Sequence, residues 1–145
     1  MPNLTVKVAP DRPPVIDLAV APTQARAEAL EARAERVPLP VVISALLDTG
    51  ADISLIAAQL AADLSLDPTG VQDVFGVGAA IPKQGIVYRV RLSFGVGPVE
   101  LAPQAQVVAV EHLSPSGVRM ILGRDLLSRC VLIYNGPQGD CTFAF

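Results

Sequence analysis

Residues 41 to 56 read Val-Val-Ile-Ser-Ala-Leu-Leu-Asp-Thr-Gly-Ala-Asp-Ile-Ser-Leu-Ile, and this stretch decides the fold. The run from Val41 to Leu47 has one polar position and several β-branched residues, which predicts a strand buried on both faces. It ends at Asp48-Thr49-Gly50, so a carboxylate directly follows the apolar run. A carboxylate in this place is costly to bury unless it is hydrogen-bonded or used in chemistry. The loop that begins at Asp48 is therefore the first candidate site.

Two later stretches strengthen this interpretation. Residues 120 to 127 read Met-Ile-Leu-Gly-Arg-Asp-Leu-Leu, and the chain ends Cys-Thr-Phe-Ala-Phe. Taken in order with Asp-Thr-Gly-Ala-Asp at residues 48 to 52, they resemble the single-lobe, retropepsin-like (retroviral-type) aspartic peptidases. The resemblance covers about residues 13 to 145 and is weaker in the middle of the chain.

The resemblance implies a mainly β fold, a half-barrel with a flap hairpin and short helices after the active-site loop and near the C-terminus. Frequent short strand patterns separated by turn signals favour the same class. The glycine-rich segment from Val74 to Gly85 resembles the flap, the hairpin that closes over substrate. After it, Ile86, Tyr88, Val90, Leu92 and Phe94 alternate with polar residues and are expected to share one buried face.

Other elements are predicted from local signals within a single domain spanning residues 1–145. Strand patterns occupy residues 4–8, 15–20, 99–110, 118–122 and 131–134. The alanine-rich segment Thr23 to Arg36 predicts a helix capped by Thr23, an insertion where retropepsins usually have a short turn. Ser54 is expected to cap a helix that runs to Leu64, and residues 67–70 are expected to form a turn.

Composition limits the function classes. With 51% apolar residues, 17% charged residues and a net charge of −3, the chain has no basic footprint for nucleic acid or for an anionic membrane. It shows neither a signal core nor an apolar stretch long enough to span a bilayer, which predicts a cytoplasmic protein. Cys130 and Cys141 are expected to be reduced thiols, and the composition predicts neither a metal site nor a cofactor.

The resemblance also assigns roles to residues. Asp48, Thr49 and Gly50 form the catalytic loop, with Thr49 bonding across a dimer axis. Substrate binding falls to Ala51, Asp52, Gly76, Val77, Gly78, Ile121 and Leu122. Arg124 is expected to support the loop through a partly buried, bidentate pair with Asp52.

An aspartic endopeptidase needs two carboxylates that share one proton, and this chain has one Asp-Thr-Gly. The second carboxylate is therefore expected from Asp48 of another copy in a homodimer that acts on peptide or protein substrates. Asn3–Val8 and Cys141–Phe145 are expected to interdigitate with the partner's copies. The alternative is a catalytically weak or inactive module of the same fold that serves dimerisation or peptide binding.

Overall fold

Strands make up most of the regular structure in the computed structural model, which describes residues 1–76, 78, 80–94 and 99–145. The strands are β1 Asn3–Lys7, β2 Val15–Pro22, β3 Val41–Leu47, β4 Leu55–Ala57, β5 Pro68–Val74, β6 Lys83–Phe94, β7 Val99–Val110, β8 Val118–Leu122, β9 Val131–Asn135 and β10 Asp140–Ala144. The helices are α1 Gln24–Ala32, α2 Ala58–Asp63 and α3 Arg124–Leu127. The predicted mainly β class is confirmed.

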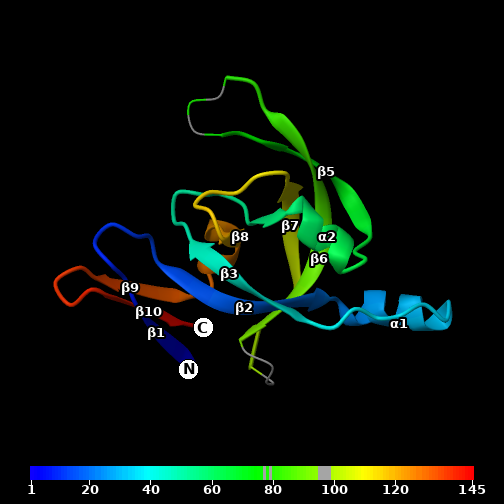
Figure 1. Ribbon diagram of the computed structural model, residues 1–145, viewed down its shortest axis with the longest axis horizontal. Coiled ribbons are helices and arrows are strands. Elements are labelled where there is room, and N and C mark those ends of the chain that lie inside the picture. The colour runs from blue at the N-terminus through cyan, green and yellow to red at the C-terminus, as the bar shows by residue number, and fades with distance from the viewer. Residues whose placement is uncertain (77, 79, 95–98) are drawn as a thin grey trace.

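The larger sheet closes into a barrel-like lobe. Its strand order is β2-β3-β8-β4-β7-β6-β5, and an additional pairing of β2 with β6 joins the two sides of the sheet (Figure 1). The pairs β3–β8 and β4–β7 are parallel, whereas β4 and β8 run antiparallel. The ends of β3 and β8 consequently lie side by side, and both candidate motifs begin where these two strands end.

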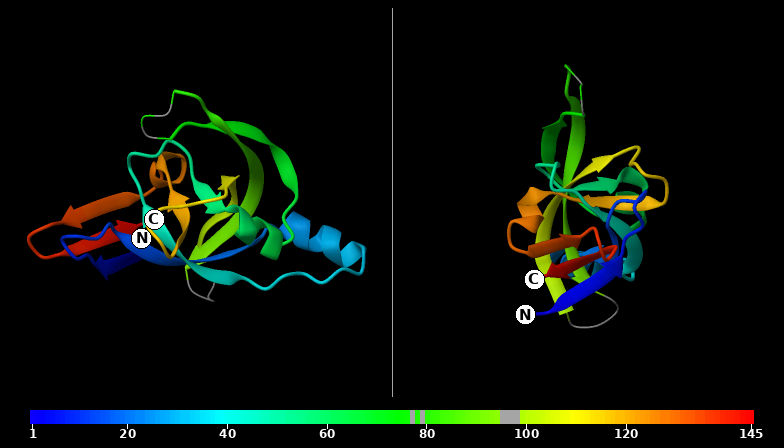
Figure 2. Two further views of the ribbon diagram at one scale, coloured as in Figure 1. Left: turned by 45° about the horizontal axis from the view of Figure 1, so that its top comes forward. Right: turned by 90° about the vertical axis from the view of Figure 1, so that its left-hand side faces the viewer.

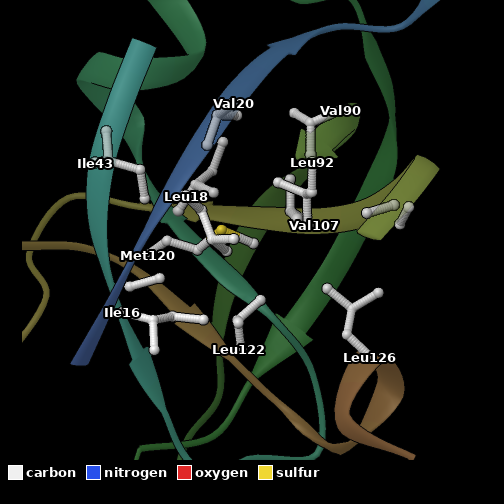
Figure 3. Packing of buried hydrophobic residues seen from close by; sticks show 14 of the residues in the cluster. Ile16, Leu18, Val20, Ile43, Val90, Leu92, Val107, Met120, Leu122 and Leu126 are labelled. Carbon is white, nitrogen blue, oxygen red and sulfur yellow. The ribbon is translucent and has the colours of Figure 1, made fainter. Parts of the chain in front are cut away.

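The interior of the lobe is filled by the inward-facing residues of these strands, among them Ile16, Leu18, Ile43, Val90 and Met120 (Figure 3). Strand β3 contributes every second residue, since Ile43, Ala45 and Leu47 are buried while Val42 is 54% exposed. The prediction that β3 is buried on both faces is therefore wrong. The strand has hydrogen-bonded neighbours on both edges, but only one of its faces lies on the core.

Strands β5 and β6 form the predicted hairpin, which stands out from the lobe (Figures 1 and 2). Ile86 was predicted to lie on the buried face of β6, and this is wrong for the half of the strand next to the hairpin turn. There Ile86 is 45% exposed, whereas its neighbour Val87 is 6% exposed. From Val90 onward the prediction is correct. The buried side changes because β6 pairs with β5 and β7 as far as Tyr88 and then with β2 in place of β5.

Helix α1 begins as predicted but ends earlier. The Thr23 hydroxyl accepts a hydrogen bond from the backbone N–H of Arg26, as an N-cap does. The helix stops at Ala32 rather than Arg36, because Ala34 adopts a left-handed φ of 56° and the N–H of Glu35 closes onto the Leu30 carbonyl. The Arg26 guanidinium ties the helix to Asp67 and to the Ser65 carbonyl.

Two predictions in the next segment are wrong. Helix α2 starts at Ala58 instead of after Ser54, because β4 occupies residues 55–57 and pairs with β7 and β8. The chain turns at Ser65, whose φ is 50°, so Pro68 already lies in β5 rather than in a turn. Three apolar residues of this segment, Ile56, Leu60 and Leu64, are fully buried and form part of the core.

The chain ends pair with each other in a second sheet of order β1-β10-β9. Strand β10 has neighbours on both edges, and Cys141 and Phe143 within it are buried. The predicted interdigitation of residues 141–145 with a partner is therefore wrong, because both edges of that strand are already occupied within one chain. Strands β1 and β9 form the outer edges of this sheet.

The two cysteines are free thiols, as predicted. Burial raises the pKa of Cys130 and of Cys141, which keeps both groups protonated near neutral pH. None of the helices in the described ranges is long and apolar enough to cross a membrane.

Candidate active site

The Asp48 loop is fixed at its start by the parallel pairing of β3 with β8. Leu47 lies opposite Leu122, and the next N–H, that of Asp48, donates to the Leu122 carbonyl at 3.1 Å. The Asp48 side chain is half-buried at this point, while Thr49 and Gly50 are exposed. The apolar strand therefore delivers one carboxylate to the surface of the lobe.

The loop holds that carboxylate through its own backbone. The N–H of Gly50 donates to Oδ1 of Asp48 at 2.9 Å, and the N–H of Ala51 donates to the Asp48 carbonyl at 3.2 Å. A Cβ on Gly50 would lie 3.1 Å from the same Oδ1, so glycine lets the backbone approach the carboxylate. One carboxylate oxygen is thus oriented by the loop.

The turn that follows β8 holds the Asp48 loop in place through backbone hydrogen bonds. The N–H of Arg124 donates to the Ala51 carbonyl at 2.8 Å, and the N–H of Asp125 donates to the Asp52 carbonyl at 3.3 Å. Gly123 has no room for a side chain, because a Cβ there would lie 2.6 Å from backbone atoms of Ile53. The two sequence motifs therefore form one structural unit, in which the turn at residues 123–125 supports the Asp48 loop.

The buried hydroxyl of Ser54, which was predicted to cap a helix, joins the two motifs. The Ser54 hydroxyl is fully buried, donates to Oδ1 of Asp125 at 2.7 Å and accepts from the Gly123 N–H at 3.0 Å. The Ser54 N–H also donates to Oδ2 of Asp125 at 3.0 Å. A serine inside the apolar run Ile53 to Ile56 was the available signal, since a hydroxyl placed there needs a partner.

Replacing Ser54 by Ala should therefore destabilise the protein by about 1–3 kcal/mol, because the Gly123 N–H loses its partner and Oδ1 of Asp125 keeps only the Leu126 N–H. Thermal or urea unfolding measures this loss. Ser44→Ala is the matched control, because its hydroxyl makes an exposed bond to Asp17 and its loss should cost within about 0.5 kcal/mol. Equal stabilities for the two variants would contradict the role given to Ser54.

Arg124 and Asp52 form the predicted ion pair through Nη2 and Oδ1. The pair differs from the prediction in two respects. A single contact joins the two side chains instead of a bidentate pair, and the side chains are 60% and 77% exposed instead of partly buried. In one chain this pair faces solvent and adds little to stability.

The other predicted residues separate into three groups. Ile121 is half-buried and stays a candidate for substrate contact, whereas Leu122 is fully buried in the core, so its predicted substrate contact is wrong (Figure 3). Gly76 and Gly78 are exposed at the end of the hairpin, and Gly78 has a φ of 72°. Val77 lies outside the described residues.

Comparisons with known proteins identify the family and the fold of the chain. A protein-family model described as aspartyl protease matches residues 24–126. No curated protein matches the chain.

Solved structures resemble the fold at low sequence identity. A retropepsin-like aspartic protease from Rickettsia conorii has a TM-score of 0.60 and 14% identity, over 99% of this chain and 91% of that one. EIAV protease, solved with the inhibitor HBY-793, has a TM-score of 0.50 and 17% identity, over 86% of this chain and 93% of that one. The aspartic proteinase from Irpex lacteus has a TM-score of 0.55 and 14% identity, over 99% of this chain but 47% of that one.

Proposed function

This chain belongs to the aspartyl protease family, and we propose from that premise that it is an endopeptidase active as a homodimer. The observation that carries the proposal is the single Asp48 carboxylate, which β3 brings to the surface and Gly50 orients through its N–H. The fit of the whole chain onto about half of the Irpex lacteus proteinase supports a single-lobe subunit.

The proposed chemistry needs Asp48 from both subunits. One carboxylate, ionised, removes a proton from water, and the resulting hydroxide attacks the carbonyl carbon of the scissile bond. The other, protonated, donates a hydrogen bond to the carbonyl oxygen as charge develops there. A proton then passes to the leaving nitrogen as the C–N bond breaks. Because the pair must hold one proton, activity should be highest below neutral pH.

The residues around Asp48 would position the subunits and the peptide. Thr49, exposed beside the carboxylate, is placed to bond with its symmetry mate. The peptide would run as an extended strand between the loop and the hairpin, along Ala51 and Asp52 on one side and Gly76 and Gly78 on the other. The Arg124 guanidinium would hold the Asp52 side chain in place for this contact.

The partner copy is proposed to cover the side of the lobe where the Asp48 loop lies. Figure 1 shows this loop, the end of the hairpin and the β9–β10 turn on the same side of the molecule. Edge strand β9 exposes Val131, Ile133 and Tyr134 by 48%, 57% and 57%. An apolar edge of this kind favours association with another copy.

A randomised peptide library tests the proposed activity. Purified protein should cleave a subset of the peptides, and a pepstatin-like inhibitor of aspartic peptidases should stop the cleavage. A dimer that binds peptides without cleaving them across the acidic and neutral pH range would favour the non-catalytic module of the same fold.

A further inference from the structure

A polar groove with a volume of about 310 Å³ opens beside residues 53 and 54, which follow the Asp48 loop. Ile53 and Ser54, which follow the loop, form one wall of the groove. The remaining polar side chains come from β5, β7 and the segment at α3, and they are Gln72, Gln104, Gln106, Asp125 and Arg129. The groove therefore adjoins the segment that directly follows the Asp48 loop.

The strand register explains why these side chains share one face. Gln72 lies opposite Gly85 in the β5–β6 pair, and Gln106 lies opposite Arg89 in the β6–β7 pair. Residues directly opposite in antiparallel strands project to the same side. The side chain of Val108 occupies the space over Gly85, where a Cβ would lie 2.3 Å from it. Arg89 thus extends the polar face beyond the groove.

The groove offers hydrogen-bond donors that the described residues leave unused. In the described part of the chain, the ion pairs involve Lys7, Arg26, Arg119 and Arg124, so Arg89 and Arg129 pair with no acid. Among the described residues, no side-chain hydrogen bond involves Gln72, Gln104 or Gln106.

The one acid in the groove is already engaged. Both oxygens of Asp125 accept hydrogen bonds, from the hydroxyl and N–H of Ser54 and from the N–H of Leu126. The groups left for a ligand consequently include the Arg129 guanidinium and the glutamine amides, whose N–H groups can donate to a carboxylate. Arginine suits this ligand because its planar fork can donate two parallel hydrogen bonds.

We propose that this groove binds a Glu or Asp side chain of the substrate, outside the two residues joined by the scissile bond, and that Arg129 sets this preference. The inference rests on the proposed peptidase function and adds a substrate class to it. In a symmetric dimer each subunit supplies one groove, so acidic residues are expected on both flanks of the cleaved bond.

Three peptide pools test the proposal. They share the same randomised apolar centre and carry Glu, Gln or Lys on both flanks. We expect the wild-type protein to cleave the Glu pool with a kcat/KM about fivefold above that of the Gln pool, which corresponds to two exposed ion pairs, one in each groove, of about 0.5 kcal/mol each. Arg129→Gln should remove this preference, and Arg129→Glu should reverse it in favour of the Lys pool.

Two controls separate a groove effect from a general one. Arg36→Glu, which makes the same charge change in the exposed segment after α1, should leave the preference at about fivefold. Ionic strength of about 0.5 M should reduce the wild-type preference, because salt screens exposed charges over a few ångströms. A preference that survives both Arg129 variants at full size would overturn the assignment of Arg129.

The outcomes also distinguish the two proposals. Equal cleavage of the Glu and Gln pools would overturn the acidic groove and leave the peptidase intact. If no pool is cleaved, the peptidase proposal fails, and fluorescence anisotropy of the labelled pools then decides the groove. Binding of the Glu pool about fivefold tighter than the Gln pool would support it, and equal binding would contradict it.

Discussion

Asp48→Asn is expected to fold and to form the same dimer as the wild type, yet to lose turnover by roughly 10³-fold or more. Asparagine keeps the shape of the side chain and can still accept the Gly50 N–H through its amide oxygen. It cannot, however, take a proton from water. Because the proposed dimer contains two copies of the change, no base is left in the site. Peptide hydrolysis by the purified variant measures the loss.

Asp11→Asn is the matched control, since it makes the same chemical change at an exposed position in the segment between β1 and β2. It should retain wild-type activity. Cleavage by Asp48→Asn at the wild-type rate, in a preparation free of other peptidases, would remove Asp48 from the mechanism.

Gly123→Ala is expected to have the largest effect on stability. A methyl group at this position would lie 2.6 Å from the carbonyl carbon and oxygen of Ile53 and 3.0 Å from the Ala51 oxygen. These are backbone atoms of the active-site segment, so they cannot move aside as a flexible side chain could. Relief of the clash would also disturb the bond from the Gly123 N–H to Ser54. We expect a loss of about 3 kcal/mol, or roughly 6–12 °C in Tm.

Gly70→Ala provides the comparison, because a Cβ there meets no atom within 4 Å. Its Tm should stay within about 2 °C of the wild type. Activity should fall with stability in Gly123→Ala, since the same contacts hold the Asp48 loop. A Gly123→Ala protein as stable as Gly70→Ala would show that the second motif does not support the first.

Much of the fold follows from local sequence signals. The run that ends at Asp48, the Thr23 cap and the hairpin after Val74 were each predicted because a single window of sequence carries the pattern. The errors arise where a neighbour outside the window decides the outcome. Ile86 and Val87 exchange places because β6 changes neighbours along its length, and Val42 is exposed because β3 has only one face on the core.

In the candidate site, too, the residues named by a sequence pattern could be predicted and the long-range contacts could not. The Asp48 loop and the Arg124–Asp52 pair could be predicted because the family pattern names them. Ile121 and Leu122 could not both contact substrate, since successive residues of a strand project to opposite faces. The bond between the buried Ser54 hydroxyl and Asp125 joins residues 71 positions apart, and no local pattern reports such a contact. The pairing of β1 with β10 is likewise a long-range register that a strand pattern does not specify.

Mixed dimers test most directly the claim that one active site needs Asp48 from two subunits. Wild-type protein is diluted together with a ninefold excess of Asp48→Asn, so that subunits exchange, and is then concentrated and assayed. If both carboxylates are required, only wild-type pairs are active, and activity per wild-type subunit should fall to about one-tenth. Mixing with Asp11→Asn instead, which is itself active, should leave the activity per total subunit unchanged. Activity per wild-type subunit that is independent of the Asp48→Asn excess, with exchange verified, would contradict the shared site.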